Sequence, residues 1–264
     1  MIGPPSDPEP TVSRRLVFLL CAVIVTACAT SPLGRRQLKL VSDEQMTQMG
    51  VASFTDLKQK TPETKDAKAT AYVSCVARNV TAVMGGGTAW EVRTFEDKAV
   101  NAFALPGGKI GVYTGLLKVA KTQDQLAAVL GHEVAHVIAG HSAERVSESL
   151  AAELGLSVVQ ASTGVNAEML GVATNVFFLL PNSRTHESEA DLLGMDYMAK
   201  AGFDPRASIA LWQNMSQSGG QKPPEMLSTH PSDATRIRQL EQRLPVALPL
   251  YEQARAQGRK PACG

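Results

Sequence analysis

Residues 122–138 have the sequence TQDQLAAVLGHEVAHVI and carry the most informative pattern in this chain of 264 residues. The stretch opens with a capping-box pattern, and apolar residues then recur at helical spacing, which predicts one long helix. His132 and His136 are four residues apart on that helix and therefore face the same way. Both imidazoles can reach one metal ion, and Glu133 beside them is placed to accept a proton from an attacking water.

The alternative is a polar helix face on which two unrelated histidines lie by chance. The neighbours Val134, Ala135 and Val137 disfavour it, because they make this helix apolar and buried. Imidazoles that are buried need polar partners. The pattern therefore predicts that His132 and His136 are two ligands of a zinc ion.

A catalytic zinc ion needs a third protein ligand and an open fourth position. A third histidine in the pattern H-E-x-x-H-x-x-G-x-x-H is disfavoured, because Gly140 and His141 are both out of that register. Glu187 is the better candidate, since Asp191 lies on the same face of a helix predicted over 183–200 and could accept a hydrogen bond from a ligand histidine. The alternative is a solvated acidic helix start, which the helix dipole also favours.

Only one part of the sequence is typical of β-structure. Residues 90–95, 100–105 and 109–114 predict three short strands that form a small meander. The apolar run 170–180 predicts a buried helix, since a membrane span needs about 20 residues. The predicted fold class is α+β, mainly α, with the three-stranded sheet beside the helix that carries His132.

The N-terminal residues 1–27 predict a lipoprotein signal peptide. Two arginines precede the apolar run 16–27, which is too short to cross a bilayer. The small residues before Cys28 resemble a bacterial lipobox, in which the signal is removed and the cysteine takes lipid. An uncut anchor, or an ordinary signal with an incidental cysteine, is the alternative. Ala29 is not an aspartate, and by resemblance to bacterial sorting rules this favours the periplasmic face of the outer membrane in a Gram-negative host.

Two further cysteines, Cys75 and Cys263, remain in the mature chain. In an oxidising compartment two leftover thiols suggest a disulfide, although the sequence does not show that they are close. The net charge of +1 and the lack of a basic patch with interleaved aromatic residues predict no nucleic-acid partner.

Several ordered motifs resemble those of the CAAX prenyl protease-type zinc peptidases, a family that includes HtpX, BepA and LoiP. The first two are HEVAH at 132–136 and ESEAD at 187–191. The others are NAFALPGG at 101–108 with YTGLL at 113–117, Ser183-Arg184, and STHPS at 228–232 with Arg236-Ile237. The resemblance covers about residues 40–240, and the predicted lipobox is typical of the LoiP-like lipoprotein branch.

This resemblance implies a gluzincin-type fold with one zinc ion per chain, Glu187 as third ligand and Asp191 behind a ligand histidine. The expected boundaries are a tether over 28–41, a zinc metallopeptidase domain over 42–245 and a C-terminal tail over 246–264. The expected function is a zinc endopeptidase of the bacterial cell envelope that cleaves misfolded or exposed peptide segments. Its expected partners are unfolded or envelope proteins, and the membrane through the lipid anchor.

Two features would shape the cleavage site. An extended substrate commonly pairs with an edge strand in zinc peptidases, and the strand with Asn101, Ala102 and Phe103 is the candidate. His230 could be a simple helix-start residue before Pro231. It could instead approach the metal, either to stabilise the oxyanion as a catalytic residue or to occupy the fourth position and hold the enzyme inactive, a role that the resemblance to BepA suggests.

Two other functions compete with proteolysis. One is an envelope assembly factor or chaperone with a structural zinc ion, but Glu133 argues against it because a structural site needs no general base. The other is a zinc hydrolase that acts on cell-wall peptides. The sequence leaves the natural substrate and the oligomeric state open.

Overall fold

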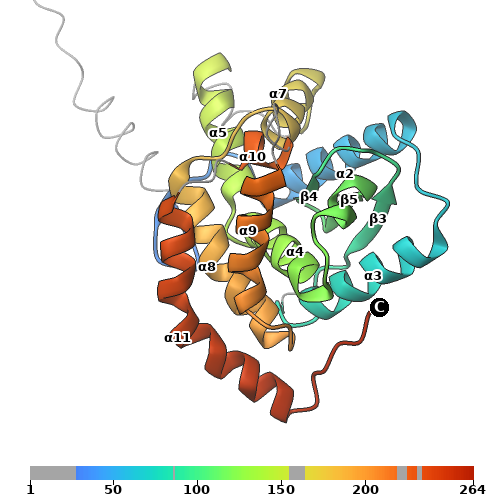
Figure 1. Cartoon of the computed structure of the whole chain (residues 1–264). Coiled ribbons are helices and arrows are strands. Elements are labelled where there is room, and N and C mark those ends of the chain that lie inside the picture. Colours follow the sequence, from blue (N-terminus) through green and yellow to red (C-terminus); the bar gives the residue numbers. More distant parts are fainter. Residues whose placement is uncertain (1–27, 86, 155–163, 219–224, 231–233) are drawn as a thin grey trace, which may run out of the picture.

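The computed structural model describes residues 28–85, 87–154, 164–218, 225–230 and 234–264 (Figure 1). The signal peptide predicted for residues 1–27 lies outside these described residues. The fold is mainly helical with two small sheets, so the predicted α+β, mainly α, class is confirmed. None of the described helices is both long and apolar enough to cross a membrane.

Two central helices, α4 (Gln123–Ile138) and α8 (Arg184–Lys200), pack against each other and form the middle of the molecule (Figure 1). They approach closely because a glycine from each helix lies at the crossing. A Cβ atom added at Gly194 would lie 2.7 Å from the backbone nitrogen of His132, and one at Gly131 would lie 2.8 Å from the carbonyl oxygen of Gly194. Only glycines allow this approach, and it brings the first turns of α8 to the histidines of α4.

A three-stranded sheet lies beside α4 and consists of β3 (Glu91–Phe95), β4 (Ala102–Leu105) and β5 (Lys109–Tyr113). The strand order is β3-β5-β4, with β3 parallel and β4 antiparallel to β5. The predicted meander is therefore wrong. After the tight turn that follows β4, strand β5 lies between β3 and β4, so β4 becomes an edge strand.

Helices cover both faces of this sheet. One face carries an aromatic cluster of Phe95, Phe103 and Tyr113, and α2 (Asp43–Lys60) covers it with Phe54. The other face packs against α3 (Ala67–Thr81) and α4. The sheet is therefore sandwiched, and the edge of β4 is the side that borders the histidines of α4.

The remaining elements surround this centre. They are β1 (Cys28–Thr30), β2 (Arg36–Leu38), η1 (Thr114–Lys118), α5 (His141–Leu154), α7 (Ala167–Phe178), α9 (Arg206–Ser218), α10 (Glu225–Thr229) and α11 (Ala234–Ala256). Helix α7 buries one face, as predicted for the apolar run 170–180. The end of that run differs, because the side chains of Leu179 and Leu180 are exposed.

The structure differs from the tether predicted over residues 28–41. Strands β1 and β2 form an antiparallel hairpin, and this hairpin is packed on the domain. The side chain of Gln37 is buried and donates a hydrogen bond to the carbonyl of Ala139, and the amide of Leu40 donates to the Ser147 hydroxyl. These contacts fix the segment, so it is part of the fold.

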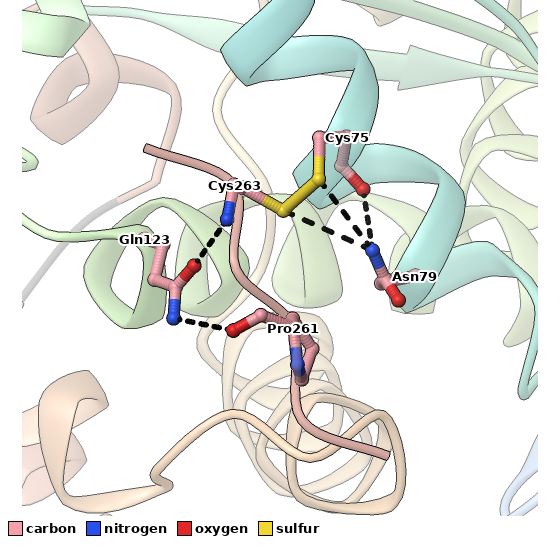
Figure 2. The surroundings of a disulfide bond; sticks show 5 residues. All are labelled: Cys75, Asn79, Gln123, Pro261 and Cys263. Carbon is pink, nitrogen blue, oxygen red and sulfur yellow. Dashed lines mark hydrogen bonds between the residues drawn. A yellow bond between two sulfur atoms is a disulfide. The ribbon is translucent and has the colours of Figure 1, made fainter. Parts of the chain in front are cut away.

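The C-terminal tail predicted over 246–264 is also corrected. Helix α11 runs through the expected boundary to Ala256, because Ala247 and Ala254 are buried and continue its apolar face. The last residues then reach α3, where Cys263 forms a disulfide with Cys75 (Figures 1 and 2). The Gln123 side chain accepts a hydrogen bond from the amide of Cys263 and donates one to the carbonyl of Pro261.

Candidate metal centre

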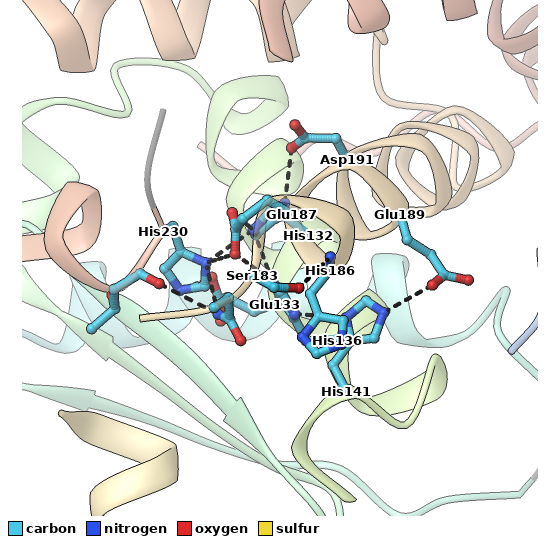
Figure 3. Close-up of polar contacts among 12 residues, drawn as sticks. His132, Glu133, His136, His141, Ser183, His186, Glu187, Glu189, Asp191 and His230 are labelled. Atoms are coloured by element: carbon cyan, nitrogen blue, oxygen red, sulfur yellow. Dashed lines mark hydrogen bonds and ion pairs between the residues drawn. The ribbon is translucent and has the colours of Figure 1, made fainter. Parts of the chain in front are cut away.

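Three side chains from α4 and α8 converge at one buried point (Figure 3). The Nε2 atoms of His132 and His136 lie 3.1 Å apart. The carboxylate oxygens of Glu187 lie 3.3 Å from the Nε2 atom of each histidine. Tetrahedral zinc with bonds of about 2.0–2.1 Å places its ligand atoms roughly 3.3 Å apart. The donor set and its spacing therefore fit one zinc ion.

The local sequence explains this convergence. His132 and His136 are one turn apart on α4, which is continuous from Gln123 to Ile138. Ser183 is the N-cap of α8, and its hydroxyl accepts a hydrogen bond from the amide of His186. This cap fixes the first turn of α8 and presents Glu187 to the histidines.

Asp191 lies one turn after Glu187 and supports the first histidine. Its Oδ1 atom is 2.9 Å from the Nδ1 atom of His132. Arg236 of α11 donates two hydrogen bonds of 2.7 Å to Asp191, and its third nitrogen lies 2.8 Å from Glu187. The guanidinium also stacks at 3.9 Å over the ring of Trp212. Arg236 thus holds both carboxylates, a role that its place in a sequence motif did not reveal.

The other ring nitrogen of His136 has an unusual partner. Its Nδ1 atom lies 2.9 Å from Nδ1 of His141, the first residue of α5. The Nε2 atom of His141 lies 3.2 Å from a carboxylate oxygen of Glu189. Figure 3 shows His141 between His136 and Glu189. His141 therefore lies behind the ligand set.

Glu133 lies beside the ligands and is buried. Burial raises the pKa of its carboxyl, although the neighbouring His230 and His132 act in the opposite direction. Glu133, His136 and His230 line one cleft, whose other wall includes β4 and the end of α7. A carboxyl group with a raised pKa at the floor of a cleft is suited to accept and return a proton.

His230 at the end of α10 joins the same group of potential ligands. Its Nδ1 atom lies 2.9 Å from Glu187 and 3.2 Å from Nε2 of His132, while its Nε2 atom lies 3.4 Å from Glu133. The Asn182 side-chain nitrogen is 3.4 Å from the same Nδ1 atom. The structure thus brings together all four predicted residues, His132, His136, Glu187 and His230.

The charges of the site favour a cation. Burial opposes ionisation of Glu187, but His230 and His132 lower its pKa well below the usual range. Burial lowers the pKa of His136 to about 3, so its imidazole is neutral and free to bind a metal. Burial also disfavours charge on His132, yet Glu187 and Asp191 raise its pKa to about 9. The carboxylates of Glu187 and Asp191 therefore stabilise a positive charge at this point.

The predicted substrate strand borders the cleft. Asn101, Ala102 and Phe103 line it together with Glu133. Among the strands that the structure describes, β4 pairs only with β5, and its other edge borders the cleft. The Phe103 ring packs edge-on against Phe178 of α7 at 5.3 Å.

Cys28, the predicted lipidation site, is the first residue of β1.

Comparisons with known proteins agree with this geometry. Residues 64–244 match the family described as Peptidase family M48. The chain is 42% identical over 181 residues to the mitochondrial metalloendopeptidase OMA1 of Schizosaccharomyces pombe, covering 67% of this chain and 54% of that protein. It is 35% identical over 246 residues to the OMA1 of Arabidopsis thaliana, covering 87% and 48%.

A bacterial relative is more distant. Metalloprotease YcaL of Escherichia coli is 27% identical over 162 residues, which cover 60% of this chain and 63% of that protein. The chain spans about half the length of the OMA1 relatives from Schizosaccharomyces pombe and Arabidopsis thaliana. The match to the family covers more than half of the chain and includes every candidate ligand, and the chain therefore belongs to peptidase family M48.

Proposed function

We propose that this protein is a zinc-dependent endopeptidase. The observation that carries the proposal is the convergence of His132, His136 and Glu187 at 3.1–3.3 Å, with Glu133 beside them in a cleft. A structural zinc site is closed and needs no general base. Here a carboxyl group with a raised pKa lies next to the ligand set, which supports hydrolysis.

His132, His136 and Glu187 would hold the ion. A zinc ion in such a site supplies Lewis-acid chemistry, since it polarises a carbonyl and lowers the pKa of water. Glu133 accepts the proton of the attacking water on its carboxylate and passes that proton to the leaving amine. Asp191 and Arg236 hold the ligands in place, because Asp191 contacts His132 and Arg236 contacts both Asp191 and Glu187.

The substrate we propose is an extended, unfolded segment of a protein. One edge of β4 pairs with no other strand in the described part of the chain, and this edge borders the cleft. A peptide added to this edge gains main-chain hydrogen bonds whatever its sequence, which suits cleavage of misfolded chains. Asn101, Ala102 and Phe103 would lie along such a peptide.

His230 is the candidate for control of this site. Of the two roles considered for it, blocking of the fourth position is better supported than oxyanion stabilisation. Its Nδ1 atom lies among the three ligand atoms, at 2.9 Å from Glu187 and 3.2 Å from His132. A group at that distance from the ligands competes with substrate for the open position.

For the cellular setting we propose a lipoprotein of the LoiP-like branch, anchored through Cys28 on the periplasmic face of the outer membrane. The N-terminal basic and apolar pattern with its lipobox supports this setting. Its partners would be unfolded or envelope proteins. A disulfide between Cys75 and Cys263 suits an oxidising compartment.

Unfolded casein tests the proposal most simply. Purified protein should cleave it, and a chelator should stop cleavage until zinc is restored. Protection of casein from aggregation without cleavage would instead support an assembly factor. Hydrolysis of cell-wall peptides without casein cleavage would support the other zinc hydrolase.

A further inference from the structure

A cluster of buried charges lies behind the ligand set, on the side of His136 that faces away from the cleft. It joins Glu144 of α5 and Glu189 of α8, whose side chains are only 9% and 5% exposed. Each carboxylate contacts one histidine: Glu189 contacts His141 at 3.2 Å, and Glu144 contacts His186 at 2.9 Å. Nothing in the proposed chemistry accounts for two such carboxylates.

The cation that contacts both carboxylates comes from the N-terminal hairpin. Arg35, just before β2, donates from Nε to Glu189 at 3.0 Å. Its two terminal nitrogens donate to the two oxygens of Glu144 at 2.8 and 2.6 Å. One guanidinium therefore holds two carboxylates from two helices in a fixed geometry, which a lysine cannot reproduce.

A second hairpin residue is tied to the helix that carries both histidines. The Gln37 side chain donates to the carbonyl of Ala139, the C-terminal cap of α4, at 2.7 Å, and to Glu144 at 3.2 Å. The hairpin lies before the region that matches the peptidase family, which begins at residue 64. Through Arg35 and Gln37 the hairpin therefore reaches the back of the metal centre.

We propose that Arg35 is a positioning residue of the metal centre and acts through Glu189 and His141 on His136. The direction of the hydrogen bonds follows from the chemistry. Because His136 would hold the metal through Nε2, its Nδ1 would carry the proton and donate to Nδ1 of His141. His141 must then carry its proton on Nε2 and donate to Glu189, and Arg35 fixes Glu189 from the other side.

This inference rests on the proposed zinc site and predicts a measurable loss of zinc affinity. Changing a partner behind a metal ligand typically weakens metal binding about 10- to 100-fold. Arg35 acts through two intermediates, so Arg35→Ala should weaken zinc binding about 10-fold, at the lower end of that range. The zinc affinity of Arg35→Lys should lie between those of the unmodified protein and Arg35→Ala, because an ammonium can hold one of the two carboxylates.

The experiment measures zinc affinity by competition with a chromogenic chelator, the melting temperature of the metal-free protein, and the absorption spectrum of the Co²⁺-substituted protein. Arg36→Ala is the matched control, because Arg36 is the next residue, carries the same charge and is exposed. It should leave zinc affinity unchanged. In Arg35→Ala and Arg35→Lys the Co²⁺ spectrum should shift, since the orientation of His136 changes.

A double-mutant cycle tests the route. In a His141→Ala background, Arg35→Ala should weaken zinc binding by less than about twofold, because contacts in one network are not additive. The inference is overturned if Arg35→Ala and Arg35→Lys lower only the melting temperature and leave zinc affinity and the Co²⁺ spectrum unchanged. A full effect of Arg35→Ala in the His141→Ala background would also overturn it.

These outcomes are separate from the fate of the proposed function. If the unmodified protein binds zinc but cleaves no peptide, the endopeptidase proposal fails and the positioning role of Arg35 stands. If the protein cleaves casein and Arg35→Ala binds zinc with unchanged affinity, only the positioning role fails.

Discussion

Replacing Gly194 with alanine should damage the metal centre without touching any ligand. The added Cβ would lie 2.7 Å from the backbone nitrogen of His132 and 2.9 Å from the carbonyl carbon of Gly131. Ordinary contacts are about 3.5 Å, so α4 and α8 must separate by roughly 0.8 Å. Metal–ligand distances tolerate only about 0.2 Å. The separation therefore moves Glu187 out of range of the two histidines.

We expect Gly194→Ala to lower the free energy of unfolding by about 1–3 kcal/mol, as overpacking does. Zinc affinity should fall at least about tenfold, which corresponds to about 1.4 kcal/mol. Urea denaturation of the metal-free protein measures the first effect, and chelator competition measures the second.

Gly171→Ala is the matched control. Gly171 lies on α7, and a Cβ there meets no atom within 4 Å. This change should raise the free energy of unfolding by about 0.4–1 kcal/mol through the unfolded state and leave zinc affinity unchanged. Unchanged zinc affinity in Gly194→Ala would refute the reasoning that the close helix crossing sets the ligand geometry.

Three further changes test other parts of the molecule. Replacing Cys75 and Cys263 with serine should lower the free energy of unfolding in urea by about 2–5 kcal/mol, because the disulfide closes a long loop, while zinc affinity stays unchanged. His230→Ala should keep zinc and raise the rate of casein cleavage, and a loss of cleavage would support the oxyanion role. The pKa of Glu91, which burial would raise, is lowered to about 2 by two lysines. Its stabilising effect is present above the ordinary pKa near 4.5 and is lost as pH falls towards 2, so thermal melts should show less acid destabilisation in Glu91→Gln.

The metal centre could be predicted from the sequence because its ligands lie on helices with regular spacing. A four-residue interval fixes the relative direction of His132 and His136, and the same interval relates Glu187 and Asp191. Apolar periodicity predicted α4, α7 and α8 for the same reason. These features depend on local geometry, which neighbouring residues determine.

Contacts between distant residues could not be predicted in this way. Strand order is one case, since alternation predicts β3, β4 and β5 but carries no information on which strand enters between the others. The hairpin is another. Its Pro and Gly residues are typical of a tether, and its fixation depends on Arg35 meeting Glu189 at a separation of 154 residues. Arg236 was noticed only as part of a motif, because its partners lie on another helix.

The most direct test of the central claim is a measurement on Glu133→Gln. This variant should bind one zinc ion per chain, as metal analysis would show, because Glu133 is not among the residues that could hold the ion. It should have lost casein cleavage, since no carboxylate remains to accept the proton. Cleavage at the unmodified rate by Glu133→Gln with its zinc intact would contradict the account.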